Sequence, residues 1–158
     1  MALDAPLFAR ENHLFVGVTG FTEPAPHHPD PRGGDVAAGA RLPATPRHLG
    51  KATATWLWGE RLAVGANAVA NGSQFLRGDE ANLLAPLAGF VVVELRASFD
   101  VSRAVSVFAK LSNALNARYG TFGALGNATA VLGPAYDDPR FESPGAPRAA
   151  WVGLALRE

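Results

Sequence analysis

Cysteine is absent from this chain of 158 residues, which excludes a disulfide framework and any chemistry that needs a thiolate. Neither sign of charge predominates, because 14 Lys and Arg residues balance 14 Asp and Glu residues. A neutral chain lacks the basic surface that nucleic-acid binding requires, so we expect no nucleic-acid partner. The lack of cysteine does not indicate a compartment, since many exported bacterial proteins lack it too.

Long uninterrupted hydrophobic runs are also missing. Residues such as Arg61, Asn67, Glu94 and Lys110 interrupt every apolar stretch before it reaches about 18 residues, the length that suggests a membrane-spanning helix. The N-terminal residues lack the basic start and apolar run of a secretory signal, so we expect no export signal in this chain. The hydrophobic content of 48% nevertheless favours one folded domain, or one piece of a domain, over disorder.

Helical patterning is scarce, because 17 glycines and 12 prolines punctuate the sequence and the apolar residues recur with a period of two. The clearest example is residues 90–99, where Val91, Val93 and Leu95 alternate with Glu94 and Arg96. A period of two places successive side chains on opposite faces of a β-strand. The predicted fold class is therefore all-β, with antiparallel up-and-down strands.

About six such strands are predicted, each of roughly ten residues. They cover residues 13–21, 49–58, 61–70, 90–99, 105–112 and 149–157. Phe108 is an exception to the alternation, since it lies on the otherwise polar side of its strand.

The connections between these strands alternate in length. Long loops rich in Gly, Pro or Asp are expected at residues 23–47, 71–89 and 113–148, and short turns at 59–60 and 100–103. Outer-membrane β-barrels have this combination of short periplasmic turns and longer extracellular loops. A soluble sandwich or barrel also shows a period of two, but it has no general reason to alternate its loop lengths.

The three tryptophans bear on the same choice. Trp56, Trp58 and Trp151 lie near strand ends, where a membrane barrel places an interfacial aromatic girdle. Each of them fits the core of a soluble protein equally well.

Several recognisable motifs occur in order along the chain. Residues 107–123, Val-Phe-Ala-Lys-Leu-Ser-Asn-Ala-Leu-Asn-Ala-Arg-Tyr-Gly-Thr-Phe-Gly, are similar to the penultimate strand, and the loop that follows it, of the C-terminal barrel of TonB-dependent outer-membrane receptors. Further similar segments are 42–48 (Leu-Pro-Ala-Thr-Pro-Arg-His), 77–82 (Arg-Gly-Asp-Glu-Ala-Asn) and 87–90 (Leu-Ala-Gly-Phe). The chain departs from the family at Ala114, Leu115 and Asn116, where Leu, Phe and Asp are usual, and at Glu158, where an aromatic residue is usual.

This resemblance implies that residues 1–158 form a partial transmembrane β-barrel, the C-terminal segment of a receptor in the bacterial outer membrane, with no plug domain present. The implied function is a share in the uptake of iron complexes or other scarce nutrients. Receptors of this kind use about 22 strands, so the chain is not expected to close a barrel or to transport alone. The implied partners are outer-membrane lipid, the remainder of the barrel and the plug, TonB through that plug, and the barrel-assembly machinery. A soluble all-β module that binds a ligand with its long loops is the alternative.

Three groups of candidate site residues follow from this interpretation. Four charged residues are expected to face the barrel lumen: Lys51, Glu94, Arg96 and Lys110. Three residues lie where a ligand-binding loop is expected, although turn formation with a salt bridge is the favoured role: Arg77, Asp79 and Glu80. Three apolar residues of the last strand resemble the barrel-assembly signal: Val152, Leu154 and Leu156.

Catalytic and metal-binding signatures are weak. The sequence has no nucleophile elbow, zinc-protease helix, phosphate loop or dinucleotide fingerprint. Asp137 and Asp138 precede Pro139, an arrangement typical of a turn. His27 and His28, with Asp30 and Asp35 nearby, suggest a metal site, but adjacent side chains point in different directions and a solvated loop is favoured. We expect no enzyme, no metal and no cofactor.

Overall fold

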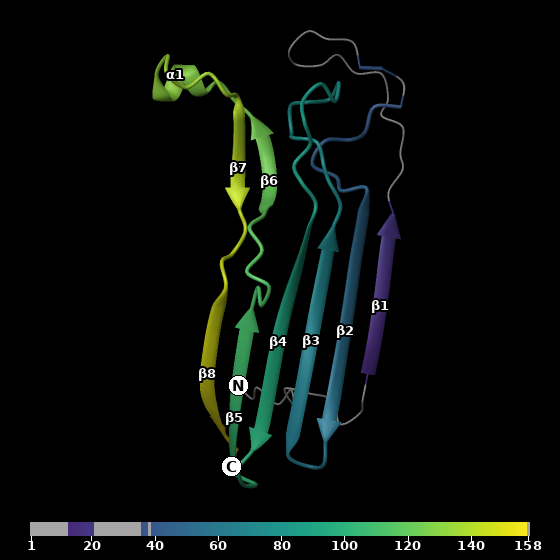
Figure 1. The fold of residues 1–158 in the computed structure, drawn as a ribbon, viewed down its shortest axis with the longest axis vertical. Coiled ribbons are helices and arrows are strands. Elements are labelled where there is room, and N and C mark those ends of the chain that lie inside the picture. Colours follow the sequence, from purple (N-terminus) through teal and green to yellow (C-terminus); the bar gives the residue numbers. More distant parts are fainter. Residues whose placement is uncertain (1–12, 21–35, 38, 158) are drawn as a thin grey trace.

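The computed structural model describes residues 13–20, 36–37 and 39–157. Its main element is a six-stranded sheet in the order β1-β2-β3-β4-β5-β8, in which every neighbouring pair is antiparallel (Figure 1). The strands are β1 (His13–Gly20), β2 (His48–Trp58), β3 (Leu62–Asn71), β4 (Phe90–Asp100), β5 (Val105–Ser112) and β8 (Ala149–Leu156). The predicted all-β fold and its six main strands are confirmed.

One expectation about the fold is wrong. Residues 113–148 are not one long loop, because they contain a second, two-stranded sheet and a short helix. These elements are β6 (Gly120–Leu125), α1 (Ala128–Leu132) and β7 (Arg140–Pro144), and the hairpin that they form continues beyond β5 and β8 (Figure 1). Strands this short carry too few alternating residues to be recognised, and β7 even contains a proline.

Residues at its two ends determine where helix α1 begins and stops. The side chain of Asn127 accepts a hydrogen bond from the backbone N–H of Ala130 at 3.0 Å and so caps the first turn. Gly133 ends the helix with a φ of 93°, a conformation that favours glycine. Among the described residues, no helix has the length and hydrophobicity needed to cross a bilayer.

The strand register separates the main sheet into two chemically different faces. Val16, Ala52, Ala68 and Val93 are paired in one row across four strands, and every further row on that side is also apolar, apart from His48 at its loop end. We call this side the apolar face. It consists of Leu14, Val16, Val18, Gly50, Ala52, Ala54, Trp56, Trp58, Leu62, Val64, Ala66, Ala68, Ala70, Val91, Val93, Leu95, Ala97, Phe99, Val105, Val107, Ala109, Leu111, Ala150, Val152, Leu154 and Leu156.

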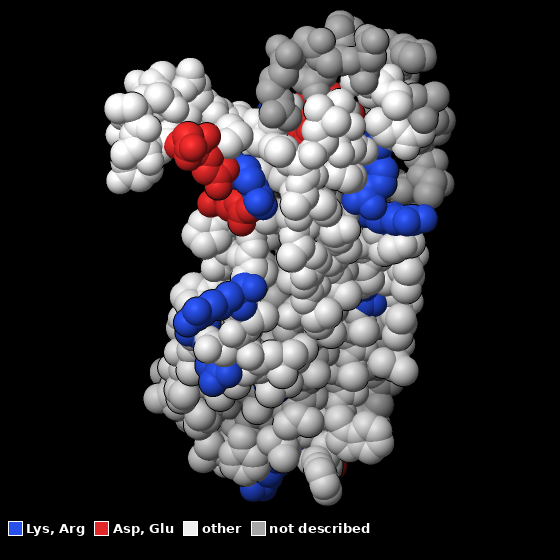
Figure 2. Space-filling view, turned by 45° about the horizontal axis from the view of Figure 1, so that its top comes forward, with Lys and Arg blue, Asp and Glu red and all other residues white. Residues whose placement is uncertain are grey.

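Within the described residues, the apolar face is not covered by any other layer. Leu14 at one edge of the sheet is 77% exposed and Leu156 at the other is 80% exposed. In the space-filling view, the visible acidic side chains lie mainly near the loop end, and basic side chains also lie at mid-height along one side (Figure 2). So large an exposed apolar area marks a surface that contacts lipid or another protein.

The buried core lies at the loop end, outside the main sheet. The buried apolar residues among those described are Val36, Leu76, Leu87 and Ala128. Two glycines of β6 make room for two of them, because a Cβ at Gly123 would lie 3.0 Å from Leu76 and a Cβ at Gly120 would lie 2.8 Å from Leu87. The β3–β4 loop and the β6–β7 hairpin therefore pack as one unit.

We expect Leu76→Ala to destabilise this unit by about 2–5 kcal/mol, because it opens a cavity at an apolar side chain that is only 1% exposed. Hydrogen exchange of residues 74–87 measures the effect. The matched control is Leu83→Ala, since Leu83 is 72% exposed and its truncation should change exchange little. Equal effects of the two variants would contradict this packing.

Candidate functional site

The face of the sheet opposite to the apolar face carries all the charged side chains of the main strands, and we call it the polar face. Thr53, Asn67 and Glu94 are paired in one row across β2 to β4, and the Ser112 side chain of β5 reaches Glu94. Within this row the hydroxyl of Thr53 donates to the side-chain oxygen of Asn67 at 2.7 Å. The hydroxyl of Ser112 donates to Glu94 at 3.3 Å. The polar side chains of this row thus satisfy one another in pairs.

The charged residues of the polar face are largely paired. The Lys110 ammonium lies 2.7 Å from the Glu94 carboxylate and 5.9 Å from the centre of the Trp151 ring. Arg96 donates to the hydroxyl of Thr55 at 3.5 Å. Because Lys110 and Glu94 are partly exposed, this ion pair adds little to the stability of the fold. It holds the two opposite charges next to each other on the polar face.

A second polar cluster lies at the turn end of the same face. The sequence pattern did not predict that its residues would meet. The carboxylate of Asp100 accepts a hydrogen bond from Ser106 at 2.5 Å and lies 3.3 Å from the guanidinium of Arg157. The backbone N–H of Arg157 also donates to Ala104 at 2.9 Å. These contacts attach the residue after β8 to the β4–β5 turn. The only signal in the sequence was that Ser106 and Arg157 lie on the polar side of their strands.

All four residues predicted to face the lumen, Lys51, Glu94, Arg96 and Lys110, lie on the polar face. Val152, Leu154 and Leu156 all project from the apolar face of the edge strand β8 and are 78%, 68% and 80% exposed. The lumen-lining role of the four charged residues stays a prediction. The role of the three β8 residues as an assembly signal also stays a prediction.

The tryptophans divide between the two faces. Trp56 and Trp58 project from the apolar face near the β2–β3 turn and are 59% and 72% exposed. Trp151 is paired with Lys110 and lies on the polar face, so it does not share a face with Trp56 and Trp58. Successive side chains of β8 point to opposite faces, and Ala150 lies on the apolar face. Trp151, the next residue, therefore lies on the polar face.

The residues expected in a ligand loop lie in the β3–β4 connection, and they differ in exposure. Asp79 is fully buried, and its carboxylate accepts hydrogen bonds from the backbone N–H groups of Leu83 at 2.9 Å and Leu84 at 3.0 Å. Glu80 is half-buried, whereas Arg77 is exposed and its backbone pairs with β6. A ligand role for these residues stays a prediction, and of the three only Arg77 is exposed to solvent.

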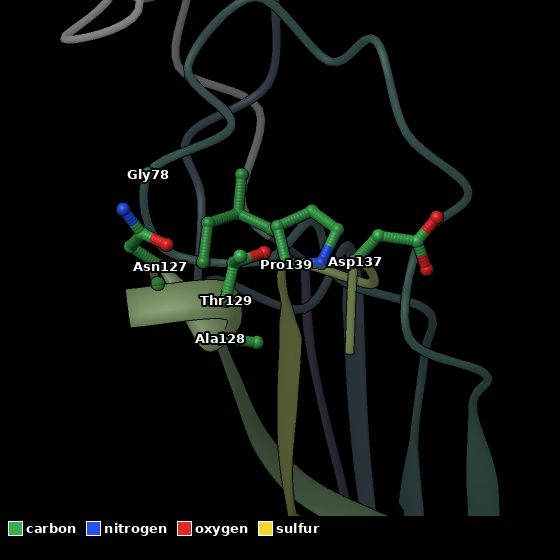
Figure 3. A pocket seen from close by; sticks show the side chains of 8 residues that line it. Gly78, Asn127, Ala128, Thr129, Asp137 and Pro139 are labelled. Atoms are coloured by element: carbon green, nitrogen blue, oxygen red, sulfur yellow. The ribbon is translucent and has the colours of Figure 1, made fainter. Parts of the chain in front are cut away.

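The loop end also contains a cavity of about 410 Å³. It lies between the β3–β4 loop and the α1 region, and it is lined by Gly78, Leu125, Gly126, Asn127, Ala128, Thr129, Asp137 and Pro139. Asn127 caps α1, and the carboxylate of Asp137 points away from Asn127 and Thr129 (Figure 3). The cavity wall is mostly apolar and does not concentrate charge.

Within the part of the chain that the structure describes, no group of three or more His, Asp or Glu residues could hold a metal ion. His27, His28, Asp30 and Asp35, which suggested a metal site in the sequence, lie outside the described residues.

Comparison with known proteins identifies the sheet. Residues 9–114, well over half of the chain, match the family described as TonB dependent receptor-like, beta-barrel. The chain belongs to this family. TonB-dependent receptors are receptors and transporters and not enzymes, so the predictions of the family and of a non-enzymatic role are confirmed.

Solved TonB-dependent receptors share the fold. The siderophore receptor PiuA from Acinetobacter baumannii aligns with a TM-score of 0.65 and 18% identity over 94% of this chain and 19% of its own. The ferric-catecholate import receptor Fiu from E. coli K12 aligns with a TM-score of 0.65 and 18% identity over 93% of this chain and 19% of its own. This chain thus spans about a fifth of the length of those receptors. A search of curated protein sequences found no significant match.

We expect Asp79→Ala to loosen the β3–β4 loop by about 0.5–2 kcal/mol, because it leaves two backbone donors without their acceptor. Faster hydrogen exchange at the amides of Leu83 and Leu84 measures this. Arg77→Ala is the control, since the Arg77 side chain is exposed, and it should leave those amides protected. Unchanged exchange in Asp79→Ala would show that the carboxylate does not organise the loop.

Proposed function

We propose that this chain forms part of the wall of a TonB-dependent receptor in a bacterial outer membrane, and that the receptor takes up iron complexes or other scarce nutrients. The observation that carries the proposal is the sheet itself, with one continuous apolar face and all the strand charges on the other. A bilayer requires this separation, because every lipid-facing position in the hydrocarbon region must be apolar.

In this proposal the apolar face contacts lipid. Its width of six strands and its exposed Leu, Val and Trp side chains would be a liability in water. Trp56 and Trp58 lie next to the short β2–β3 turn, where their rings would reach the interfacial region of the bilayer.

The polar face lines the lumen in the same proposal. Lys51, Glu94, Arg96 and Lys110 then face water, a substrate path or the plug domain. The Glu94–Lys110 pair would present a locally neutral surface, and Lys51 would be a cationic contact for an acidic group of the plug or of a substrate. TonB would act through the plug and not on these strands.

The six strands are proposed to belong to the C-terminal part of the barrel and, because they are too few to enclose a channel, to be unable to transport by themselves. In the described sheet, β1 and β8 each have a neighbour on one side only, so each leaves a row of backbone donors and acceptors unpaired. Pairing with further barrel strands would satisfy both edges. Val152, Leu154 and Leu156 on β8 are the residues that the barrel-assembly machinery would recognise.

The nature of the substrate is proposed only as a class. The similar structures include receptors for siderophores and ferric catecholates and, at a TM-score of 0.53, the copper transporter OprC. These cargoes differ in chemistry although the strands are alike, which supports selection of the substrate by loops and plug. In the described part of the β3–β4 loop, the exposed Arg77 is the proposed contact for an anionic ligand.

A pair of adjacent valines provides a sharp test of the lipid contact. Val93 lies on the apolar face, and its neighbour Val92 lies on the polar face opposite Val69. We expect Val93→Arg to weaken insertion by about 2–4 kcal/mol and Val92→Arg to have a much smaller effect. Co-flotation of the refolded chain with dilauroylphosphatidylcholine vesicles measures insertion. Equal losses in the two variants would contradict the assignment of the faces.

Detergent dependence separates a membrane segment from a soluble all-β binding module. We expect the chain to require detergent, and to aggregate or form oligomers without it, because its apolar face and two strand edges are exposed. Light scattering and circular dichroism with and without detergent measure this. A monodisperse β-rich monomer in plain buffer would contradict the proposal and favour the soluble module.

A further inference from the structure

We propose that three contacts between an aromatic ring and a glycine lock the register of the C-terminal hairpin, whose two arms are β5–β6 and β7–β8. The pairs are Phe108 with Gly153, Tyr119 with Gly145, and Phe141 with Gly126. The first pair lies in the β5–β8 ladder, the second in the segment between the two ladders, and the third at the far end of the β6–β7 ladder. The lock concerns contacts within this chain and holds whether or not the chain joins a longer barrel.

The apolar face by itself cannot define how β5 pairs with β8. In the observed register Val107 lies opposite Leu154 and Ala109 lies opposite Val152. A slip of two residues along β8 keeps every side chain on its own face and again places apolar residues opposite one another. The hydrophobic pattern alone therefore does not select one register.

The contact between Phe108 and Gly153 removes this ambiguity. Phe108 lies directly opposite Gly153 on the polar face, and a Cβ at Gly153 would lie only 2.3 Å from the tip of the Phe108 ring. The ring therefore lies on the bare backbone of Gly153. A slip of two residues would place Trp151 or Ala155 under the ring, and both have the Cβ that this position excludes.

The contact between Tyr119 and Gly145 defines the segment where the two ladders meet. A Cβ at Gly145 would lie 2.2 Å from the Tyr119 ring, and the backbone N–H of Gly145 donates to the carbonyl of Tyr119 at 2.7 Å. The Tyr119 ring also contacts Phe90 of β4, and the two ring centres lie 4.3 Å apart. The linker is thereby attached to β4 as well.

The third contact lies at the far end of the hairpin. A Cβ at Gly126 would lie 2.9 Å from the Phe141 ring, and the N–H of Gly126 donates to the carbonyl of Pro139 at 2.9 Å. The β6–β7 ladder has a register irregularity between Gly120 and Phe122, so it cannot transmit the register of β5–β8 by regular pairing. Separate contacts at each level are therefore needed.

Engineered cysteine pairs can measure the register, because the chain has no cysteine of its own. Ala109→Cys with Val152→Cys reports the observed register, since directly opposite Cα atoms are close enough for a disulfide. Ala109→Cys with Ala150→Cys, and Ala109→Cys with Leu154→Cys, report slips of two residues in either direction. The full chain is folded in detergent micelles and oxidised, and the intramolecular products are quantified on non-reducing gels.

We expect Gly153→Val to reduce the product of the observed register by about tenfold and to raise one of the slipped products, because the valine overpacks against Phe108. The matched control is Ala149→Val on the same face of the same strand, opposite Ser112, which should leave the observed register unchanged. An unchanged product in Gly153→Val would overturn the proposal.

An exchange of the two residues keeps the test decisive if Gly153→Val fails to fold. Directly opposite residues of an antiparallel pair are related by a local two-fold axis, so Phe108→Gly with Gly153→Phe recreates the contact. We expect the exchanged chain to recover the product of the observed register. Loss of that product in Gly153→Val without recovery in the exchanged chain would overturn the lock as well.

Discussion

The antiparallel hydrogen-bond ladder that runs from β1 to β8 is the constraint on which the rest of this structure depends. Because it pairs residues directly across the strands, it places Val16, Ala52, Ala68 and Val93 in one apolar row and Thr53, Asn67 and Glu94 in a neighbouring polar row. A shift of one residue in any pair would place charges among the apolar side chains. The two faces, the paired charges and the uncovered apolar surface all follow from this register.

This arrangement is the reverse of a soluble domain, whose sheets bury their apolar faces. Here, within the described residues, the main sheet leaves that face uncovered, and the tightly buried cluster around Leu76 and Leu87 lies among the loops. The loop end therefore has a core of its own, formed where Gly120 and Gly123 let those leucines approach β6 closely. The sheet thus exposes an apolar face, and the loops pack around a separate core. Both features are consistent with membership of the TonB-dependent receptor family.

Ion pairs and close contacts at glycines contribute to this fold in different ways. The Glu94–Lys110 and Arg157–Asp100 pairs are partly exposed, so solvent weakens them. Contacts such as that of Phe108 with Gly153 act through steric exclusion, which salt and water do not weaken. The proposed register lock gives Phe108 a role on the otherwise polar side of β5, an exception that the alternation pattern alone leaves without a reason.

Alternation along the chain was sufficient to predict the six main strands, the two faces and the shared polar face of Lys51, Glu94, Arg96 and Lys110, because the direction of a side chain in a strand depends only on local backbone geometry. Ordered motifs were sufficient to indicate the family. The β6–β7 hairpin, the burial of Asp79 and the cluster of Asp100, Ser106 and Arg157 were decided only by the tertiary structure. Each of these depends on which distant residues the register brings together, and a period of two carries no information about partners.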